Sequence, residues 1–141
     1  MLTLSDPSLL CSKLYINGEW VDADNGATMP VSNPANKKDI INIPNAGAVE
    51  TRRAIEAADV AFESWRNVVA KERSAILKRW YQLIMANQED LAKIMTAEQG
   101  KPLAESRGEV AYGAAFVEWF AEEGRRVNGD TIEANNPTQR I

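Results

Sequence analysis

The sequence contains no histidine and only one cysteine, Cys11. Without histidine, this chain can form neither a Ser-His-Asp triad nor a Cys-His pair, and the usual nitrogen ligand of protein-bound zinc is missing. A single cysteine cannot form an internal disulfide, which fits a reducing compartment. Triad chemistry, histidine-based zinc sites and a disulfide framework are therefore excluded for these residues.

Long apolar runs and basic clusters are also missing. No stretch approaches the roughly 18 apolar residues of a membrane span. The N-terminal segment has no basic leader, and Asp6 and Pro7 interrupt its short apolar stretch, so it is a poor secretory signal. The formal net charge is -4, whereas nucleic-acid-binding domains are usually basic. We therefore expect a cytoplasmic protein without membrane or nucleic-acid partners.

The sequence offers few groups for catalysis. The eight glycines are scattered, and no G-x-G-x-x-G or Walker pattern occurs. Cys11 has only Lys13 as a nearby cation, so we expect an inert thiol rather than a nucleophile. Glu118 and Glu122 share a helix face at i and i+4. With no histidine beside them, a solvated face is a better interpretation than an acid–base pair. We predict no catalytic residue in this chain.

The first 44 residues read as a flexible leader, 1–13, and a β-hairpin region, 14–44. Asn17-Gly18 is a strong hairpin signal because both positions of a tight turn need positive φ. A second polar turn covers residues 33–39. The pattern predicts four short strands, flanking these two turns in pairs: Leu14–Ile16 with Trp20–Val21, and Met29–Ser32 with Ile40–Ile43.

Residues 45–129 show helical periodicity. Three amphipathic segments are predicted. The first runs from about Val49 to Trp65, with Ile55, Ala58, Phe62 and Trp65 on one face. The second starts at about Ala70, is interrupted at Asn87-Gln88 and ends at Gly100, and the third runs from Leu103 to Val127. The last segment is apolar over most of its circumference, which is typical of a helix buried among several neighbours. It also contains Gly108 and Gly113, for which close packing against another backbone is a reasonable explanation.

These elements predict a mixed α and β fold that is mostly helical, with N-terminal β-hairpins followed by three or four long helices. Residues 130–141 turn polar, and Gln139–Ile141 resembles the beginning of a strand. Composition and spacing alone lead to a folded, mostly helical and partly incomplete domain.

Six strings carry a more specific signal. In order, they are Ile16–Trp20 (INGEW), Asn33–Ala35 (NPA), Ala57–Trp65 (AADVAFESW), Glu98–Glu105 (EQGKPLAE), Phe116–Glu123 (FVEWFAEE) and Gly129–Ile132 (GDTI). Their wording, order and spacing resemble the N-terminal segment of the aldehyde dehydrogenase superfamily. The fourth and fifth strings are most similar to the succinate-semialdehyde and glutarate-semialdehyde dehydrogenases.

The resemblance implies that residues 45–129 form the helical part of a Rossmann-like α/β cofactor domain, and that residues 130–141 start a bridging or oligomerisation strand. For the full-length parent it implies NAD or NADP and a cysteine nucleophile, with a glutamate that activates water. Those residues follow the position of Ile141 in the family, and Cys11 does not match the nucleophile motif. We therefore expect this chain to bind no cofactor alone and to be inactive alone.

The resemblance also implies two sites. The family helix that matches Leu103 to Val127 lines the substrate tunnel, so Tyr112 and Phe116 are expected to face it, with plain core packing as the alternative. Some relatives bind a structural cation with an acidic residue that matches Glu98 and with backbone carbonyls near Val31 and Ser32. Hard oxygen ligands suit such an ion, although helix capping or an ion pair would equally explain the carboxylate.

Two functional hypotheses follow. The first is an N-terminal fragment of a semialdehyde dehydrogenase, with succinate semialdehyde as the expected substrate of the parent. Its partners would be the remainder of the dehydrogenase chain and further copies in a homo-oligomer. The alternative is a stand-alone helical protein-interaction module derived from such an enzyme. The first hypothesis predicts uncovered apolar helix faces and self-association of the isolated chain, whereas a cooperatively folding monomer would favour the module.

Overall fold

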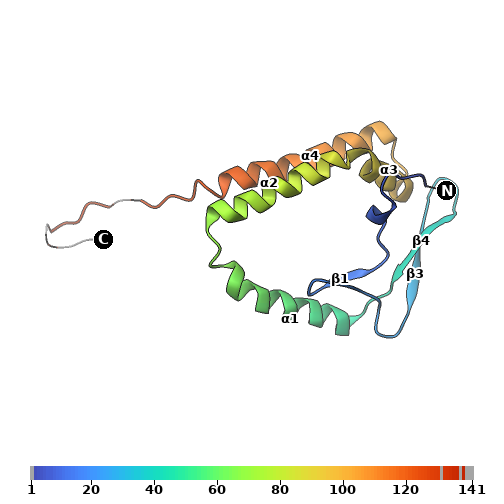
Figure 1. The fold of residues 1–141 in the computed structure, drawn as a ribbon, viewed down its shortest axis with the longest axis horizontal. Helices are drawn as coiled ribbons and strands as arrows, with labels where there is room; N and C mark the ends of the chain where they lie inside the picture. Colours follow the sequence, from blue (N-terminus) through green and yellow to red (C-terminus); the bar gives the residue numbers. More distant parts are fainter. Residues whose placement is uncertain (1, 131, 137, 139–141) are drawn as a thin grey trace.

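The computed structural model describes residues 2–130, 132–136 and 138 of the chain. Two small β-hairpins are followed by four helices (Figure 1). The elements are η1 (Pro7–Leu9), β1 (Leu14–Ile16), β2 (Glu19–Val21), β3 (Thr28–Ser32), β4 (Asp39–Pro44), α1 (Ala48–Trp65), α2 (Ala70–Ala86), α3 (Gln88–Gln99) and α4 (Leu103–Glu123). The predicted mixed, mostly helical fold is confirmed.

The first hairpin forms where the sequence predicts it. Strands β1 and β2 pair antiparallel, and the turn residues Asn17 and Gly18 both have positive φ, at 52° and 84°. Tyr15 and Trp20 lie opposite each other, and their ring centroids are 5.0 Å apart. This cross-strand aromatic contact stabilises a ribbon to which the described residues add no third strand.

The second hairpin, β3–β4, is also antiparallel, with an irregularity between Val31 and Ser32. Its connection is closed by Asn33, whose carbonyl accepts the Lys37 N–H at 2.8 Å and whose N–H donates to the Lys38 carbonyl at 2.9 Å. Its tip rests on the end of α3, because a Cβ built on Gly100 would lie 2.8 Å from Pro34 Cγ. The two hairpins remain separate two-stranded sheets.

The helix boundaries follow local signals. Helix α2 ends at Ala86, and Asn87 separates it from α3 as predicted. Gly100 ends α3 with a φ of 85°, a conformation that glycine adopts at little cost. Pro102 lies just before the first turn of α4, and its carbonyl accepts the Ser106 N–H.

Helices α2, α3 and α4 form one packed layer, in which α4 runs back along α2 (Figure 1). Its buried positions are small: Ala92 and Ala97 on α3, and Ala114 and Ala121 with the larger Val110 on α4. Small side chains let helix axes approach closely. This layer is the main core of the described chain.

One expectation for the last helix is wrong, and a second, close packing at its glycines, finds no support within the described residues. Helix α4 ends at Glu123 rather than Val127, because after Gly124 the Arg125 and Arg126 N–H groups bond to carbonyls only three residues back, which closes the helix. A Cβ built on Gly108 or Gly113 would meet no atom within 4 Å. No other backbone of the described chain packs against these glycines.

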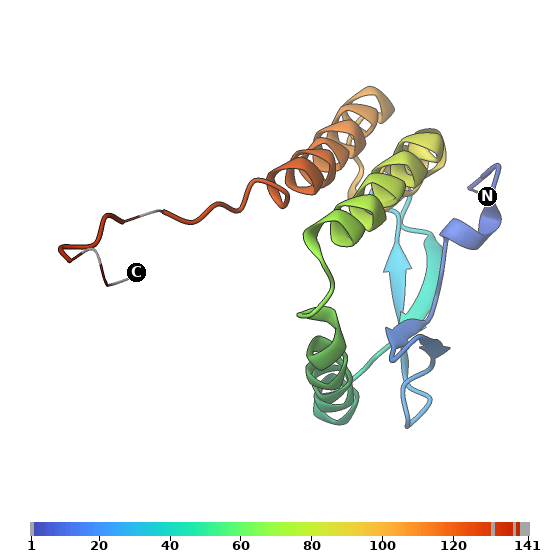
Figure 2. The ribbon, with the colours of Figure 1, turned by 60° about the vertical axis from the view of Figure 1, so that its left-hand side comes forward.

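Helix α1 lies apart from the α2–α4 layer, beside the first hairpin (Figures 1 and 2). The side that faces the hairpin carries Arg53, Ala57 and Val60, which line a shared hollow with β1 and β2. No helix of the described residues is long and apolar enough to cross a membrane. After α4 the described chain forms no helix or strand, and the strand predicted at Gln139–Ile141 lies outside the described residues.

Candidate functional site

The most distinctive surface is an aromatic stripe on α4, formed by Tyr112, Phe116, Trp119 and Phe120. These residues recur at intervals of three or four, so they share one side of the helix. They line a hollow of about 320 Å³ together with Ala115. The rings of Tyr112 and Phe116 meet edge to face, with centroids 4.9 Å apart and planes at 87°.

The α4 stripe is exposed, although its composition is that of a core. Between 48% and 66% of each of the four side chains is accessible. The buried side of α4, with Val110, Ala114 and Ala121, lies almost opposite the stripe around the helix and faces α2 and α3. Tyr112 and Phe116, which the resemblance assigns to the substrate tunnel, therefore lie together on an uncovered apolar surface. Trp119 and Phe120 extend this surface, and the same spacing in the sequence would have indicated them.

Polar contacts fix α4 on its layer. Ser106, fully buried, shares a 2.8 Å hydrogen bond with the hydroxyl of Thr96 on α3. Arg107 donates two hydrogen bonds to the Glu89 carboxylate, at 2.7 and 3.0 Å. These bonds lower the pKa of Glu89 and raise the pKa of Arg107. None of these contacts involves a residue of the α4 stripe, so the orientation of α4 does not depend on the stripe.

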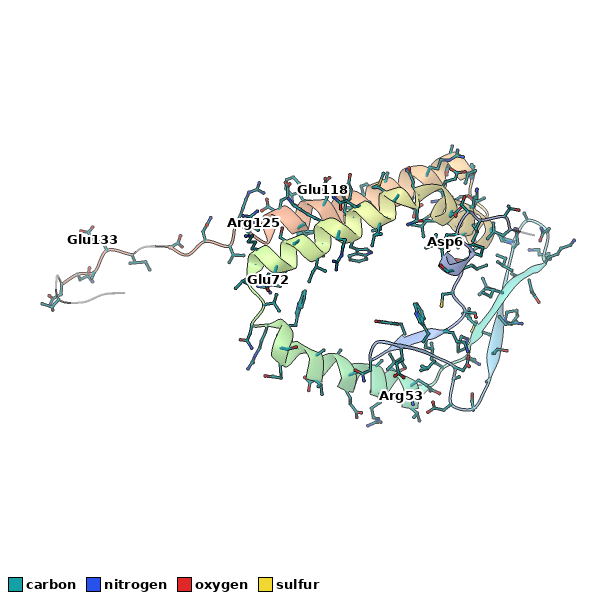
Figure 3. The ribbon with its side chains drawn as sticks, viewed as in Figure 1. Asp6, Arg53, Glu72, Glu118, Arg125 and Glu133 are labelled. Atoms are coloured by element: carbon teal, nitrogen blue, oxygen red, sulfur yellow. The ribbon has the colours of Figure 1, made fainter. Side chains whose placement is uncertain are left out.

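A buried carboxylate holds the N-terminal leader. Asp90 at the start of α3 is 4% exposed, and one of its oxygens accepts the N–H groups of Ser5 and Asp6, at 2.7 and 2.8 Å. The Asp6 N–H first, then the hydrogen bond from Lys93 and the Ser5 N–H, hold the pKa of Asp90 below its ordinary value. The leader, expected to be flexible, contains the short helix η1 and is tied to α3 by these hydrogen bonds. Asp6 is labelled in Figure 3.

A second buried carboxylate orients α1. Glu50 accepts the Asp24 N–H at 2.8 Å and the Gly47 N–H at 2.9 Å, which caps the first turn of the helix. The Asp24 N–H contributes most to lowering the pKa of Glu50, followed by the N–H groups of Glu50 itself and Gly47. Arg53, one turn later, makes two hydrogen bonds to the Asp24 carboxylate.

Two further apolar stripes are uncovered. The predicted apolar face of α1, with Ile55, Phe62 and Trp65, points away from the hairpin because it lies almost opposite the Arg53 and Val60 side. These side chains are 64%, 54% and 42% exposed. On α2 the stripe consists of Ile76, Trp80 and Leu83, which are 43% to 56% exposed. Side chains project into the space between α1 and the α2–α4 layer from both sides (Figure 3).

The two elements of the predicted cation site end near each other. Pro34, two residues after Ser32, lies against Gly100, two residues after Glu98. Glu98 is exposed and lines a hollow between α2, α3 and α4, while Val31 is partly buried in β3. Among the described residues no cluster of three or more His, Cys, Asp or Glu side chains could hold a metal ion. A site built from one carboxylate and backbone carbonyls stays a prediction.

The described residues contain no glycine-rich phosphate-binding loop. The glycines with positive φ lie at a hairpin turn, a loop and a helix end, as Gly18, Gly26 and Gly100, and do not form one phosphate-binding loop. Cys11 is an exposed thiol. Glu118 is exposed on α4, and Glu122 lies 3.7 Å from Lys78. The α4 stripe can bind apolar groups, but it carries no nucleophile.

Curated proteins are similar to this chain in sequence. The glutarate-semialdehyde dehydrogenase of Pseudomonas putida is 56% identical over 140 residues, and the succinate-semialdehyde dehydrogenase [NADP(+)] of Escherichia coli is 51% identical over 140 residues. Each match covers 99% of this chain and 29% of the relative. The chain thus spans less than a third of the length of these curated relatives and corresponds to their N-terminal part.

Solved structures share the fold. The crystal structure of an aldehyde dehydrogenase from Brucella melitensis biovar abortus matches with a TM-score of 0.96 and 52% identity, over 99% of this chain and 29% of that one. Residues 20–141 match the model of the aldehyde dehydrogenase family. The chain belongs to the aldehyde dehydrogenase family.

Proposed function

We propose that this chain is the N-terminal part of an NAD(P)-dependent semialdehyde dehydrogenase that oxidises a short semialdehyde with a terminal carboxylate, with succinate semialdehyde as the first candidate. One observation carries the proposal. Relatives named for glutarate semialdehyde and succinate semialdehyde match 99% of the chain at more than half identity. Glutarate semialdehyde is the alternative substrate.

In this proposal the chain supplies binding surface rather than chemistry. The α4 stripe forms one apolar wall of the substrate tunnel, with Tyr112 and Phe116 nearest to the aldehyde chain. Apolar walls exclude water from a reacting group and orient its carbon chain. The cofactor, the nucleophile and the water-activating base belong to the part of the enzyme that this chain does not include.

A chimera tests the proposal. The 141 residues replace the matching 140 residues of the Pseudomonas putida glutarate-semialdehyde dehydrogenase, and the rate of NADH or NADPH formation is measured with both semialdehydes. We expect turnover by the chimera and none by the chain alone. Replacing Cys11 with serine should leave the chimera's rate unchanged. An inactive chimera that folds and assembles would contradict the proposal.

Substitutions in the chimera test the tunnel wall. Tyr112→Ala or Phe116→Ala should lower kcat/KM by about tenfold or more, because the aldehyde chain loses apolar contact in the transition state. The control is Glu118→Ala on a different side of α4, which should change kcat/KM by less than about twofold. Equal effects of all three substitutions would show that α4 acts only through stability.

The alternative function is a stand-alone interaction module, and the three uncovered stripes support it. Sequencing the gene beyond the codon for Ile141 separates the two. A reading frame that continues into cysteine-nucleophile and cofactor motifs supports the dehydrogenase. A stop codon, together with a cooperatively folding monomer, supports the module.

A further inference from the structure

The leader is joined to the rest of the chain at one point. Among the described residues, every hydrogen bond between residues 2–12 and the rest of the chain ends on the same carboxylate oxygen of Asp90. That oxygen accepts the N–H groups of Ser5 and Asp6. Lys13, next along the chain, pairs with Asp22 just after β2. A single side chain on α3 therefore provides the polar attachment of residues 2–12.

Residues 2–12 form their own turn and bury little apolar surface. The Asp6 carboxylate accepts both the N–H and the hydroxyl of Ser8, at 3.0 and 2.6 Å. The short helix η1 closes on the carbonyls of Asp6 and Pro7. None of these residues is buried, and the four leucines among them are each partly exposed. This leaves the two charge-assisted hydrogen bonds to Asp90 as the strongest attachment of the segment.

We propose that residues 2–12 are a releasable strap and that Asp90 is its latch. The strap detaches as one unit while the helices of the α2–α4 layer stay folded. It closes one side of a hollow of about 580 Å³, which Leu2 lines together with Ile40 of β4 and Ala97 of α3. Release opens this hollow and exposes the surface of α3 around Asp90, so this face of the chain has a closed and an open form.

Two features keep the cost of release low. The hydrogen bond that joins α3 to α4, between Thr96 and Ser106, involves no residue of the strap. Lys93 donates to the other oxygen of Asp90 at 3.3 Å, so this carboxylate keeps a charged partner after release. Segments with few buried contacts open locally at a lower free energy than a packed core does. The strap is therefore expected to open before the helices do.

Hydrogen exchange of the 141-residue chain, followed by mass spectrometry, tests the latch. Peptides that contain Ser5 and Asp6 should exchange about tenfold or more faster than peptides from the buried side of α4. Asp90→Ala should speed exchange in the strap by a further factor of about ten or more, and should change exchange in α4 by less than about twofold. Unchanged exchange in the strap would show that its leucines hold it, and equal acceleration in α4 would place Asp90 in the core. Either result would overturn the proposal.

Glu89→Ala is the matched control. Glu89 is the other carboxylate in the first turn of α3, and it bonds to Arg107 rather than to the strap. This substitution should change exchange in the strap by less than about twofold. Equal acceleration of the strap by Asp90→Ala and Glu89→Ala would show that Asp90 acts only through the stability of α3, which would exclude a latch.

A spin label on Cys11 gives a second readout that does not depend on hydrogen exchange. Cys11 is the only cysteine of the chain, and it is exposed within the strap. Paramagnetic resonance spectra should show a faster-moving label in Asp90→Ala and an unchanged label in Glu89→Ala, while circular dichroism checks that both variants keep their helices. A label that stays immobile in Asp90→Ala would contradict release of the strap.

Discussion

Shortening Val110 to alanine tests whether the α2–α4 layer is a true core in the isolated chain. Val110 is 7% exposed on the inner side of α4. The substitution removes two methyl groups, each worth about 0.8 kcal/mol of buried apolar transfer, so the transfer loss is about 1.6 kcal/mol. A fully rigid cavity would add about 1 kcal/mol. Val110 also lines the hollow between α2, α3 and α4, and neighbouring side chains can relax there, so we expect a total of about 2 kcal/mol.

The assay is thermal unfolding followed by far-ultraviolet circular dichroism, at protein concentrations low enough to limit association. A loss of about 2 kcal/mol corresponds to a decrease in Tm of roughly 5 to 8 °C for a chain of this length. The matched control is Val127→Ala, which makes the same chemical change at a residue that is 86% exposed beyond α4. This control should shift the free energy of unfolding by less than about 0.5 kcal/mol. Equal shifts for both variants would refute the packed layer.

Three further predictions concern pH, association and the thiol. The lowered pKa values of Asp90 and Glu50 mean that their contribution to stability is complete above their ordinary pKa values and is lost as the pH falls through the lower folded-state values. Tm should therefore fall below about pH 4, and Asp90→Asn should flatten that dependence; a parallel pH profile for the variant would contradict this. The isolated chain should self-associate and bind a hydrophobic dye through its stripes, whereas a dye-free monomer in sedimentation would count against the exposed faces. Labelling of Cys11 by a thiol reagent should proceed at the rate of a free cysteine, and strong acceleration would reveal an activated thiolate.

Local signals in the sequence predicted most of the secondary structure. Asn17-Gly18 adopts the positive φ values that favour a hairpin turn, and Gly100 ends α3 with the positive φ that its position suggests. The end of α4 was misjudged because Arg125, Arg126 and Val127 continue a helical pattern, and only the three-residue hydrogen bonds after Gly124 show that the helix has closed. Hydrophobic periodicity does not show how much one glycine near the end of a helix destabilises the helix.

The anchors of the fold were not predictable in the same way. Asp90 and Glu50 look like ordinary surface carboxylates of helical first turns. Their partners at Ser5, Asp6 and Asp24 are backbone N–H groups, which every residue except proline carries and which leave no trace in the sequence. Ser5 and Asp90 are also 85 residues apart along the chain, so no local sequence pattern could predict their contact. The capping role of Glu50 had one usable signal, a glutamate three residues after Gly47.

The apolar stripes show where periodicity reaches its limit. The spacing of Ile55, Phe62 and Trp65 identified the apolar face of α1, yet the first hairpin covers the opposite side of that helix, around Arg53 and Val60. A hydrophobic face indicates that its burial is favourable, but it does not indicate which residues cover it. In this chain three helices retain such a face after all the internal contacts of the described residues are made. The pattern therefore identifies helix faces whose burial is favourable, and hydrophobic-dye binding by the isolated chain measures how far these faces are uncovered.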